Sequence, residues 1–427
     1  IYTLSLHDAL PIFGRPSTCS WRCRVMRVRR FSSMRILVTG SKGFVGSNLC
    51  EGLKAIRDSK DCRKRYQTFL PLDVMECDRD ITTDKLDSYC ERAEFVVHLA
   101  GVNRPAEGDF SSNIASLGDV LSRLERAKNF APVLLSSSAQ AYLTGHYEGS
   151  EYGKSKLDAE RILRQYAKAH STLVYVFRFP NLYGKWCRPH YNSFVATLCD
   201  AIANDRDYHV DDPSTELELL YIDDLVTCVL ETMLGNVLPD ADGICHAGPT
   251  DRITIGEIIR LLRSFHDSRE TLAVPNLTVG SFPKKLYSTF LSYYELGSLA
   301  YDLASSLDER GSFTEFLRMP DCGQVSVNVS KPGITKGQHW HNAKAEKFLV
   351  VSGHALIRER RVGTDFKGSP YPVDEYEVDG THPRVVEMAP GMTHSITNLS
   401  DTDDLVTVIW ANEAFNPSVP DTYHEEV

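Results

Sequence analysis

Residues 34–46 read Met-Arg-Ile-Leu-Val-Thr-Gly-Ser-Lys-Gly-Phe-Val-Gly, and this stretch decides the fold of the chain. Its apolar start predicts a buried strand, and a helical pattern follows the glycines. A strand, a glycine turn and a helix in this order form the phosphate-binding unit of dinucleotide-binding folds, in which the helix N-terminus faces the phosphates. We therefore predict a parallel α/β sheet that binds a dinucleotide through Gly40, Gly43, Phe44, Val45 and Gly46.

A second pattern supplies acid–base chemistry. The apolar run Val133–Ser138 predicts a buried strand that ends on hydroxyls, and Tyr152 and Lys156 lie four residues apart, on one face of a predicted helix. A tyrosine with a pKa of about 10 is a poor acid–base group at neutral pH. A nearby ammonium, together with a positive nicotinamide, favours tyrosinate. The candidate catalytic residues are Ser138, Tyr152 and Lys156, with Ser137 as the alternative hydroxyl.

The two patterns together resemble the extended short-chain dehydrogenase/reductase family, whose glycine motif is G-x-x-G-x-x-G. Phe95–Gly101 resembles its fourth strand, whose end lines the cofactor, and Val133–Ser138 resembles its fifth. The resemblance implies that Ser138 hydrogen-bonds the substrate carbonyl and that Lys156 also holds the nicotinamide ribose. It adds Ala100, Gly101 and Pro180 to the cofactor-binding residues. The gap from Ser138 to Tyr152 is shorter than in most family members, which suggests a trimmed loop over the active site.

Polar residues near the ends of the predicted strands are candidates for substrate binding. Arg178–Gly184 resembles the family segment that follows the sixth strand and contacts substrate, and a basic loop comes directly after it. Such a loop could bind the diphosphate of a nucleotide sugar, or it could be a solvated basic loop without that role. The candidate substrate-binding residues are Asn103, Arg104, Asn181, Lys185, Arg188 and Asn192.

The sequence gives little indication of whether the cofactor is NADPH or NADH. We predict that the second strand ends near Leu70–Asp73, where an acid favours a free ribose 2′-hydroxyl and therefore NADH. Nearby cations could instead serve a 2′-phosphate, and these are Arg63, Lys64, Arg65 and Arg79. The sequence leaves both cofactors open.

A metal-type pattern lies in the C-terminal part. His339 and His341 are two residues apart, so they point to the same side of a predicted strand. Glu346 would come from the next strand and His394 from a distant one. Three imidazoles and a carboxylate suit zinc or a divalent iron or manganese ion. We predict that these four residues bind a divalent metal, for which zinc is our first choice.

The metal pattern lies among short strand-like runs, which include Val325–Val329, Lys347–Val351 and Leu405–Trp410. Glycine and proline punctuate them and helical periodicity is absent, which predicts a small antiparallel β-barrel. The spacing from Gly333 to Gly353 resembles the first motif of the cupin superfamily, and Gly391-x-x-His394-x-x-x-Asn398 resembles much of the second. The turn Ala389-Pro390-Gly391 departs from the usual Pro-x-Gly.

Length and composition set the organisation. A chain of 427 residues is too long for one ordinary domain. We expect an α/β Rossmann-like reductase domain over residues 34–290 and a cupin metal-binding domain over residues 300–427. Residues 1–33 resemble an adapter translation followed by an Arg-rich run, so we expect a non-native or disordered leader with the natural start at Met34. A transit peptide is the alternative.

Charge and cysteine usage exclude several roles. The net charge of -10 argues against nucleic-acid and anionic-membrane partners. No apolar run approaches the roughly 20 residues that span a bilayer. The 11 cysteines are scattered without C-x-x-C pairs, which is typical of reduced thiols, so we expect a cytoplasmic protein.

A reductase followed by a cupin resembles a family of two-domain capsular polysaccharide synthesis enzymes. The resemblance rests on residues 36–46, 98–105, 308–316 and 331–341, with Pro420-Asp421-Thr422-Tyr423 near the end of the chain. It implies a homodimer, zinc in the cupin, and two steps on a UDP-sugar. The cupin would epimerise a UDP-4-keto-6-deoxy-N-acetylhexosamine at C3, and the reductase would then reduce the C4 ketone with NADPH. The implied product is UDP-2-acetamido-2,6-dideoxy-β-L-talose, a precursor of N-acetyl-L-fucosamine.

Two alternatives stay open at this point. The chain could be a plain 4-ketoreductase whose cupin has no catalytic role, or a nucleotide-sugar sensor without activity. If the cupin is an epimerase, its metal acts as a Lewis acid beside a base that moves the C3 proton. Lys336 and His382 are the candidates for that base.

Overall fold

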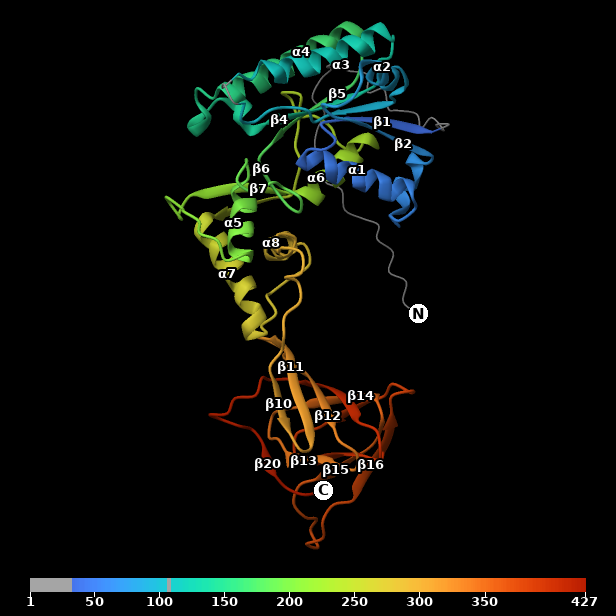
Figure 1. Cartoon of the computed structure of the whole chain (residues 1–427), viewed down its shortest axis with the longest axis vertical. Coiled ribbons are helices and arrows are strands. Elements are labelled where there is room, and N and C mark those ends of the chain that lie inside the picture. Colours follow the sequence, from blue (N-terminus) through green and yellow to red (C-terminus); the bar gives the residue numbers. More distant parts are fainter. Residues whose placement is uncertain (1–32, 106–108) are drawn as a thin grey trace, which may run out of the picture.

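The computed structural model describes residues 33–105 and 109–427. The chain forms three parts along its longest axis: a parallel α/β sheet at one end, a smaller mixed part in the middle, and a β-rich part at the other end (Figure 1). Apart from Ser33, the predicted leader over residues 1–33 lies outside the described residues. Within the described part of the chain, no helix is both long and apolar enough to span a membrane.

Six parallel strands form the first sheet, in the order β2-β1-β3-β4-β5-β8. Their bounds are Met34–Thr39 (β1), Leu72–Cys77 (β2), Phe95–His98 (β3), Val133–Ser138 (β4), Val174–Phe179 (β5) and Ile244–Cys245 (β8). The prediction of a parallel α/β fold is confirmed. The strand order reverses between β1 and β3, and in open parallel sheets ligands bind outside the carboxyl ends of the strands at such a switch point.

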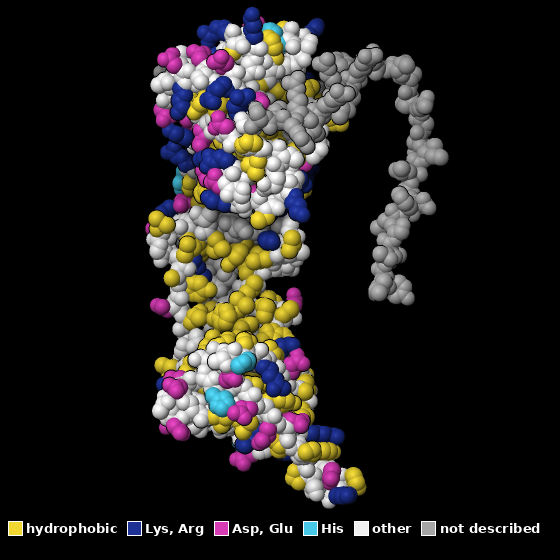
Figure 2. Space-filling model, turned by 90° about the vertical axis from the view of Figure 1, so that its right-hand side faces the viewer, with side chains coloured by type: hydrophobic (Ala, Val, Ile, Leu, Met, Phe, Trp, Pro, Cys, Tyr) yellow, Lys and Arg dark blue, Asp and Glu magenta, His cyan; other side chains and the backbone are white. Residues whose placement is uncertain are grey.

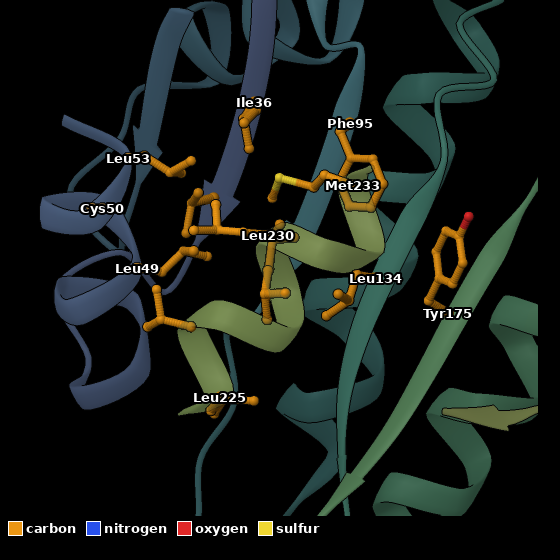
Figure 3. Packing of buried hydrophobic residues seen from close by; sticks show 14 of the residues in the cluster. Ile36, Leu49, Cys50, Leu53, Phe95, Leu134, Tyr175, Leu225, Leu230 and Met233 are labelled. Carbon is orange, nitrogen blue, oxygen red and sulfur yellow. The ribbon is translucent and has the colours of Figure 1, made fainter. Parts of the chain in front are cut away.

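Helices cover both faces of this sheet, as Figure 1 shows. α1 (Phe44–Arg57) and α6 (Ile222–Met233) cover one face, and α2 (Thr83–Arg92), α3 (Ser111–Arg126) and α4 (Glu151–His170) cover the other. Ile36 packs with Leu49, Leu53 and Leu230 on the first face (Figure 3), whereas Leu37 belongs to the core on the second. Burial on both faces is why β1 reads as a nearly continuous apolar run.

The predicted position of the second strand is wrong. β2 begins at Leu72, and its register with β1 pairs Met34 with Leu72 and Thr39 with Cys77. Asp73 therefore lies near the amino-terminal ends of β1 and β2, at the opposite end of these strands from the glycine turn. β2 is an edge strand in which only half of the residues are buried, so its apolar signal is weak, and the run before it ends in the cis proline Pro71. The residues that follow β2 at the ligand edge are Asp78–Asp80.

Only α2 connects β2 to β3, so Phe95–His98 is the third strand of the sheet rather than the fourth. The middle part is built on a three-stranded sheet of β6 (Asn181–Tyr183), β7 (Glu216–Tyr221) and β9 (Thr250–Thr254). α5 (Phe194–Ala203), α7 (Ile255–Thr271) and α8 (Phe282–Leu291) pack with it around a core that includes Tyr183 and Phe290. This part faces the carboxyl ends of β4 and β5.

The C-terminal part consists of two antiparallel sheets, in the orders β10-β11-β12-β19-β14-β17 and β16-β15-β18-β13-β20. The first contains β10 (Ser305–Asp308), β11 (Gly311–Met319), β12 (Gly323–Ser330), β14 (Glu346–Ser352), β17 (Val385–Met388) and β19 (Leu405–Ala411). The second contains β13 (Thr335–Trp340), β15 (His354–Arg361), β16 (Val373–Asp379), β18 (Met392–Asn398) and β20 (Tyr423–His424). The predicted strands at Val325–Val329, Lys347–Val351 and Leu405–Trp410 lie in β12, β14 and β19.

The inward faces of both sheets meet in one core. Phe348 and Val350 of β14 pack with Ile357 of β15 and Ile396 of β18. The C-terminal part also contacts the middle part through backbone hydrogen bonds. Val274 N donates to Arg318 O at 2.6 Å, and Arg318 N donates to Leu272 O at 2.7 Å. These bonds tie β11 to the segment that follows α7.

Candidate active site and metal centre

The glycine turn joins two strand ends at the switch point. Gly40 has a φ of 68°, and a Cβ placed on it would lie 2.8 Å from the backbone nitrogen of Ala100. A Cβ on Gly46 would lie 2.1 Å from the carbonyl oxygen of Gly40. Both positions therefore require glycine, because backbone meets backbone there. Gly43 caps α1 without a side-chain hydrogen bond among the described residues, which leaves the helix N-terminus free to face a phosphate.

Tyr152 and Lys156 lie on the first turns of α4, one above the other. Ser150 begins this helix, and its Oγ accepts a hydrogen bond from Gly153 N at 3.0 Å. Lys156 Nζ lies 5.7 Å from the centroid of the Tyr152 ring and donates to Ser136 O at 3.0 Å. A Cβ on Gly101 would come within 3.1 Å of the same Nζ. The buried Lys156 side chain thus ties α4 to β4 and lies close to Gly101, in the loop after β3.

Burial shifts both groups toward their neutral forms. It raises the pKa of Tyr152 to about 12, with a smaller contribution from Tyr191. It lowers the pKa of Lys156 to about 8, against the opposing charge of Glu160. Burial of Tyr152 therefore opposes the tyrosinate form, which the Lys156 ammonium together with a positive nicotinamide is expected to favour. A tyrosine that keeps its proton at neutral pH is the form that can donate one.

The two candidate serines differ in their contacts. Ser138 Oγ accepts from Gln140 N at 3.2 Å, so its own proton is free for another acceptor. Ser137 is buried, and its hydroxyl donates to Glu160 Oε1 at 2.5 Å. Glu160 also pairs with Arg178, at 2.8 and 3.0 Å. This buried network occupies Ser137, so Ser138 is the better candidate for the reacting hydroxyl.

The predicted substrate residues lie at the carboxyl ends of β3 and β5. Asn103 and Arg104 belong to the loop after β3, and Pro180 and Asn181 follow β5 directly. Lys185 Nζ pairs with Asp223 Oδ1 at 2.5 Å. The two remaining candidates are exposed on the loop before α5, and these are Arg188 and Asn192. Asn103 and Arg104 thus follow β3, and the other four candidates lie between the end of β5 and the start of α5.

Two buried polar residues of this site were missed in the sequence. Asn113 accepts from Val102 N at 2.6 Å and donates to Val102 O at 3.1 Å and to Ser155 Oγ at 3.2 Å, so it holds the loop after β3 against α4. His98 Nδ1 lies 2.9 Å from Thr39 Oγ1. Burial lowers the pKa of His98 to about 3, helped by Lys156. The run His98-Leu99-Ala100-Gly101 could have indicated that His98 lies at the cofactor site, whereas a single asparagine in an amphipathic helix gives no such indication.

The four predicted metal ligands converge in the β-rich part. His339, His341, Glu346 and His394 each offer a ligand atom, and these atoms all lie within 4.8 Å of one another. The register of β13 with β18 pairs His339 directly with His394, after a bulge at Gln338, whose φ is 61°. Glu346 begins β14, and its Oε2 lies 3.5 Å from His394 Nε2 and 3.8 Å from His341 Nε2.

The chemistry of this cluster fits a divalent cation. The Nε2 atoms of His341 and His394 are buried and have no hydrogen-bond partner among the described residues. Burial, with the neighbouring imidazoles, lowers the pKa of His339 to about 4, so this ring is neutral at physiological pH. Burial opposes ionisation of Glu346, but the neighbouring His341 and His394 and the charge of Lys344 hold its pKa below the usual range. Three imidazoles and a carboxylate are a typical zinc donor set.

The two candidate bases lie in different surroundings. Lys336 Nζ donates to Asn328 Oδ1 at 2.9 Å and to Val329 O at 2.8 Å, and burial lowers its pKa. The side chain of His382 is 89% exposed on the turn after β16. Glu359, which no sequence pattern marks, is buried on β15 opposite His394, and its Oε1 has no hydrogen-bond partner in the described part of the chain. Its pKa is raised by burial.

The parallel sheet, its glycine turn and the Tyr152–Lys156 pair define the class of Rossmann-like nicotinamide-dependent proteins. The family model described as "NAD dependent epimerase/dehydratase family" matches residues 36–237, and the model described as "Polysaccharide biosynthesis C-terminal domain" matches residues 306–423. UDP-2-acetamido-2,6-beta-L-arabino-hexul-4-ose reductase of Pseudomonas aeruginosa is 38% identical over 392 residues, which cover 91% of this chain and 98% of the relative.

Solved structures agree with this relationship. The chain is similar to the capsular polysaccharide assembling protein CapF of Staphylococcus aureus, with a TM-score of 0.81 and 43% identity over 92% of this chain and 100% of CapF. It is also similar to CapF crystallised with the inhibitor 3-isopropenyl-tropolone, with a TM-score of 0.77 and 42% identity over the same shares of the two chains. The chain belongs to the family of these two-domain reductases.

Proposed function

We propose that this protein reduces a UDP-4-keto-6-deoxy-N-acetylhexosamine at C4 with NADPH, after its C-terminal cupin has epimerised the same sugar at C3. The product would be UDP-2-acetamido-2,6-dideoxy-β-L-talose, for N-acetyl-L-fucosamine in a surface polysaccharide. The observation that carries the proposal is the presence of a tyrosine–lysine–serine constellation and a metal-type cluster on one chain. The Pseudomonas relative is named as a 4-ulose reductase, and CapF as a capsule-assembling protein.

In the proposed reduction, a bound nicotinamide supplies the hydride to C4. Tyr152 delivers the proton to the C4 oxygen, which its raised pKa suits, and it is left as tyrosinate beside the Lys156 ammonium. Ser138 donates its free proton in a hydrogen bond to the same oxygen. Gly40, Gly43 and Gly46 leave room for the pyrophosphate, with Phe44 and Val45 at the helix start. Ala100, Gly101 and Pro180 line the cofactor at the ends of β3 and β5.

The end of β2 supports NADPH over NADH. Asp78 follows this strand, and its carboxylate accepts hydrogen bonds from Lys42 N at 2.9 Å and from Arg79 N at 2.8 Å. The acid that could bind a ribose 2′-hydroxyl is thus engaged by the glycine loop. Arg79 stands at the same end of the strands and suits a 2′-phosphate, whereas Lys42 Nζ pairs there with Asp80 Oδ2 at 2.7 Å.

The C-terminal part supports the proposed cupin. Its two antiparallel sheets enclose one core, and its ligands come from β13, the residue after it, β14 and β18. A zinc ion held there by His339, His341, Glu346 and His394 would supply a Lewis acid that makes a C–H beside a ketone more acidic. Lys336 and Glu359 are the proposed proton carriers, since both are turned into the β-rich part and His382 is not.

A homodimer is proposed as the working state. Large apolar side chains are exposed from the segment after α8 into β10, where the middle part joins the β-rich part: Leu296, Leu299, Tyr301, Leu303 and Leu307. Leu296 is fully exposed and Leu307 is 78% exposed. Figure 2 shows hydrophobic side chains gathered at this narrow waist. A monomer rarely exposes so continuous an apolar surface, so a second copy is the proposed occupant.

Separate loss of the two activities tests the proposal. Tyr152→Phe should lower NADPH oxidation by about 10²- to 10⁴-fold, because the proton donor is lost, and should leave solvent-deuterium incorporation at C3 intact. His339→Ala should abolish deuterium incorporation, because a metal ligand is lost. Metal content of both variants and product stereochemistry complete the measurement.

Each outcome bears on one half of the proposal. Normal deuterium incorporation in His339→Ala would refute the epimerase step and leave a plain 4-ketoreductase with a non-catalytic C-terminal part. Undiminished NADPH oxidation in Tyr152→Phe would refute the reductase assignment.

A further inference from the structure

The motif Pro420-Asp421-Thr422-Tyr423 lies against the metal cluster, and the proposed function gives it no role. We propose that Asp421 is a positioning residue of the metal site, which holds the loop between His341 and Glu346 with its carboxylate and the ring of His341 with its carbonyl oxygen. The proposal rests on the proposed metal site. It adds a second layer of contacts from a segment distant in sequence.

The carboxylate of Asp421 closes the loop that separates two ligands. Its Oδ1 accepts from Asn342 N at 2.9 Å, and its Oδ2 accepts from Ala343 N at 2.8 Å and from Lys344 N at 3.0 Å. Three successive backbone N–H groups thus converge on one anion, and such charge-assisted bonds are stronger than neutral ones. They also hold the pKa of Asp421 well below its usual range, at about 2. The loop between His341 and Glu346 is fixed as a consequence.

The same loop controls the orientation of Glu346. Lys344 is buried, and its Nζ lies 3.2 Å from Glu346 Oε1. The other oxygen, Oε2, is the one that faces His341 and His394. A displacement of the loop backbone at Lys344 would therefore move the carboxylate that completes the cluster.

The carbonyl oxygen of Asp421 fixes the first ligand of the loop. His341 Nδ1 hydrogen-bonds this oxygen, and only its protonated form can donate there. The proton on Nδ1 leaves Nε2 as the free lone pair, and Nε2 is the atom that is buried toward the cluster. A ligand histidine whose other nitrogen bonds a backbone carbonyl is the usual device for fixing tautomer and ring orientation.

Residues after Asp421 extend the contact to the other two histidines. β20 pairs with β13 so that His424 lies opposite His339, and the Tyr423 ring stacks on Trp340 with centroids 4.7 Å apart. Thr393, next to His394, donates its hydroxyl to Glu425 O. One short segment therefore touches both strands that carry the histidines, and this geometry separates Asp421 from an ordinary loop cap.

The test compares Asp421→Asn with a matched control. An asparagine has one acceptor oxygen where the aspartate uses two, so at least one of the three loop bonds is lost. Asp365→Asn is the control, because Asp365 Oδ1 also accepts from two backbone groups, Lys367 N at 2.8 Å and Ser369 N at 2.9 Å, on a hairpin between β15 and β16. Zinc affinity of the full chain is measured by competition with a chromophoric chelator, together with the melting temperature of the metal-free protein.

We expect Asp421→Asn to bind zinc about 10- to 100-fold more weakly than the unaltered chain, the range for lost outer contacts of metal ligands. Asp365→Asn should bind zinc normally, and the two variants should melt alike without metal. Unchanged zinc affinity in Asp421→Asn would overturn the proposal, and so would a metal-free melting temperature far below that of the control, since that marks a purely structural role. Asp421→Glu, which keeps the charge, should recover part of the affinity, and its failure to do so while folded would also count against the proposal. If the unaltered chain bound no zinc, the proposed metal site itself would be wrong.

Discussion

Two adjacent serines at the end of β4 differ in what their hydroxyls contact. The hydroxyl of Ser137 donates a hydrogen bond to Glu160, which also pairs with Arg178. The hydroxyl of Ser138 accepts a hydrogen bond from a backbone N–H, so its own proton can be donated to another group. A strand alternates its side chains between faces, so neighbouring serines must have different surroundings. The buried carboxylate decides which of the two is tied down.

This difference predicts opposite consequences for Ser138→Ala and Ser137→Ala. Ser138→Ala should lower kcat for NADPH oxidation by about 10²-fold or more, because a donor to the reacting oxygen is lost, with little change in stability. Ser137→Ala should lower the free energy of unfolding by about 1–3 kcal/mol, because Glu160 keeps its burial and loses a hydrogen bond. Steady-state kinetics and denaturant unfolding measure both. If Ser137→Ala were the variant that lost activity at unchanged stability, the two roles would have to be exchanged.

The metal cluster shows the same principle at the level of single side chains. Each histidine alone could be an ordinary core or surface residue. What marks the cluster is that two buried Nε2 atoms have no partner among the described residues while a carboxylate oxygen lies within 4 Å of both. Buried polar atoms without a partner are costly, so a cation is the group that suits them.

At the scale of elements, the register of neighbouring strands determines which residues lie beside the glycine turn. Thr39 and Cys77 are paired in the register of β1 and β2, so the residues after β2 lie beside the glycine turn. Arg63, Lys64 and Arg65 precede β2 and belong to the opposite edge of the sheet. Of the four cations proposed from the sequence for a 2′-phosphate, the register leaves Arg79 at the cofactor edge.

Arg79→Ala should therefore raise KM for NADPH by about tenfold or more, since one charge-assisted contact is worth about 1.5–3 kcal/mol. KM for NADH should change little. Arg65→Ala is the control, because Arg65 pairs with Glu231 on α6 at 3.1 Å, and it should alter neither constant. An equal rise in KM for both cofactors in Arg79→Ala, or a rise in KM for NADPH alone in Arg65→Ala, would contradict the assignment of Arg79 to the 2′-phosphate.

At the scale of the whole molecule, the two proposed sites lie in different parts of an elongated chain, since the glycine turn and Tyr152 belong to the α/β part and the metal cluster to the β-rich part (Figure 1). The middle part joins them through α8, the apolar waist and backbone hydrogen bonds between residues 272–274 and Arg318. In the proposed two-step reaction, a sugar made in one site would therefore have to leave it before it reaches the other. The apolar waist is exposed in the single chain, and the proposed dimer would cover it.

The double variant Leu296→Lys with Leu307→Lys should convert the protein to a monomer, because two charges would be buried in the proposed interface. Sedimentation velocity at micromolar protein measures the change in mass. Leu238→Lys is the control, since Leu238 is 75% exposed in the segment after α6 and outside the waist, and this variant should keep the mass of the unaltered protein. A monomeric unaltered chain, or a dimer that survives both lysines, would count against the waist as the interface.

Much of this protein could be predicted from the sequence because its signals are local. The glycine turn after β1, the Tyr152–Lys156 spacing on one helix and the His339–His341 pair each depend on backbone geometry within a few residues, so the chain itself determines them. The parallel α/β fold and the antiparallel strands followed from the same local periodicities.

Tertiary structure alone decided which distant groups meet. The register of β2 with β1 places Asp78–Asp80, and not Asp73, beside the glycine turn, where residues can select NADPH or NADH. The hydrogen bond to Glu160 engages the hydroxyl of Ser137 and not that of Ser138. Asp421 reaches the His341 loop from about 80 residues away, a separation that no periodicity encodes. Burial also raises the pKa of Tyr152, because the cost of a buried charge depends on everything packed around it and not on the neighbour four residues along.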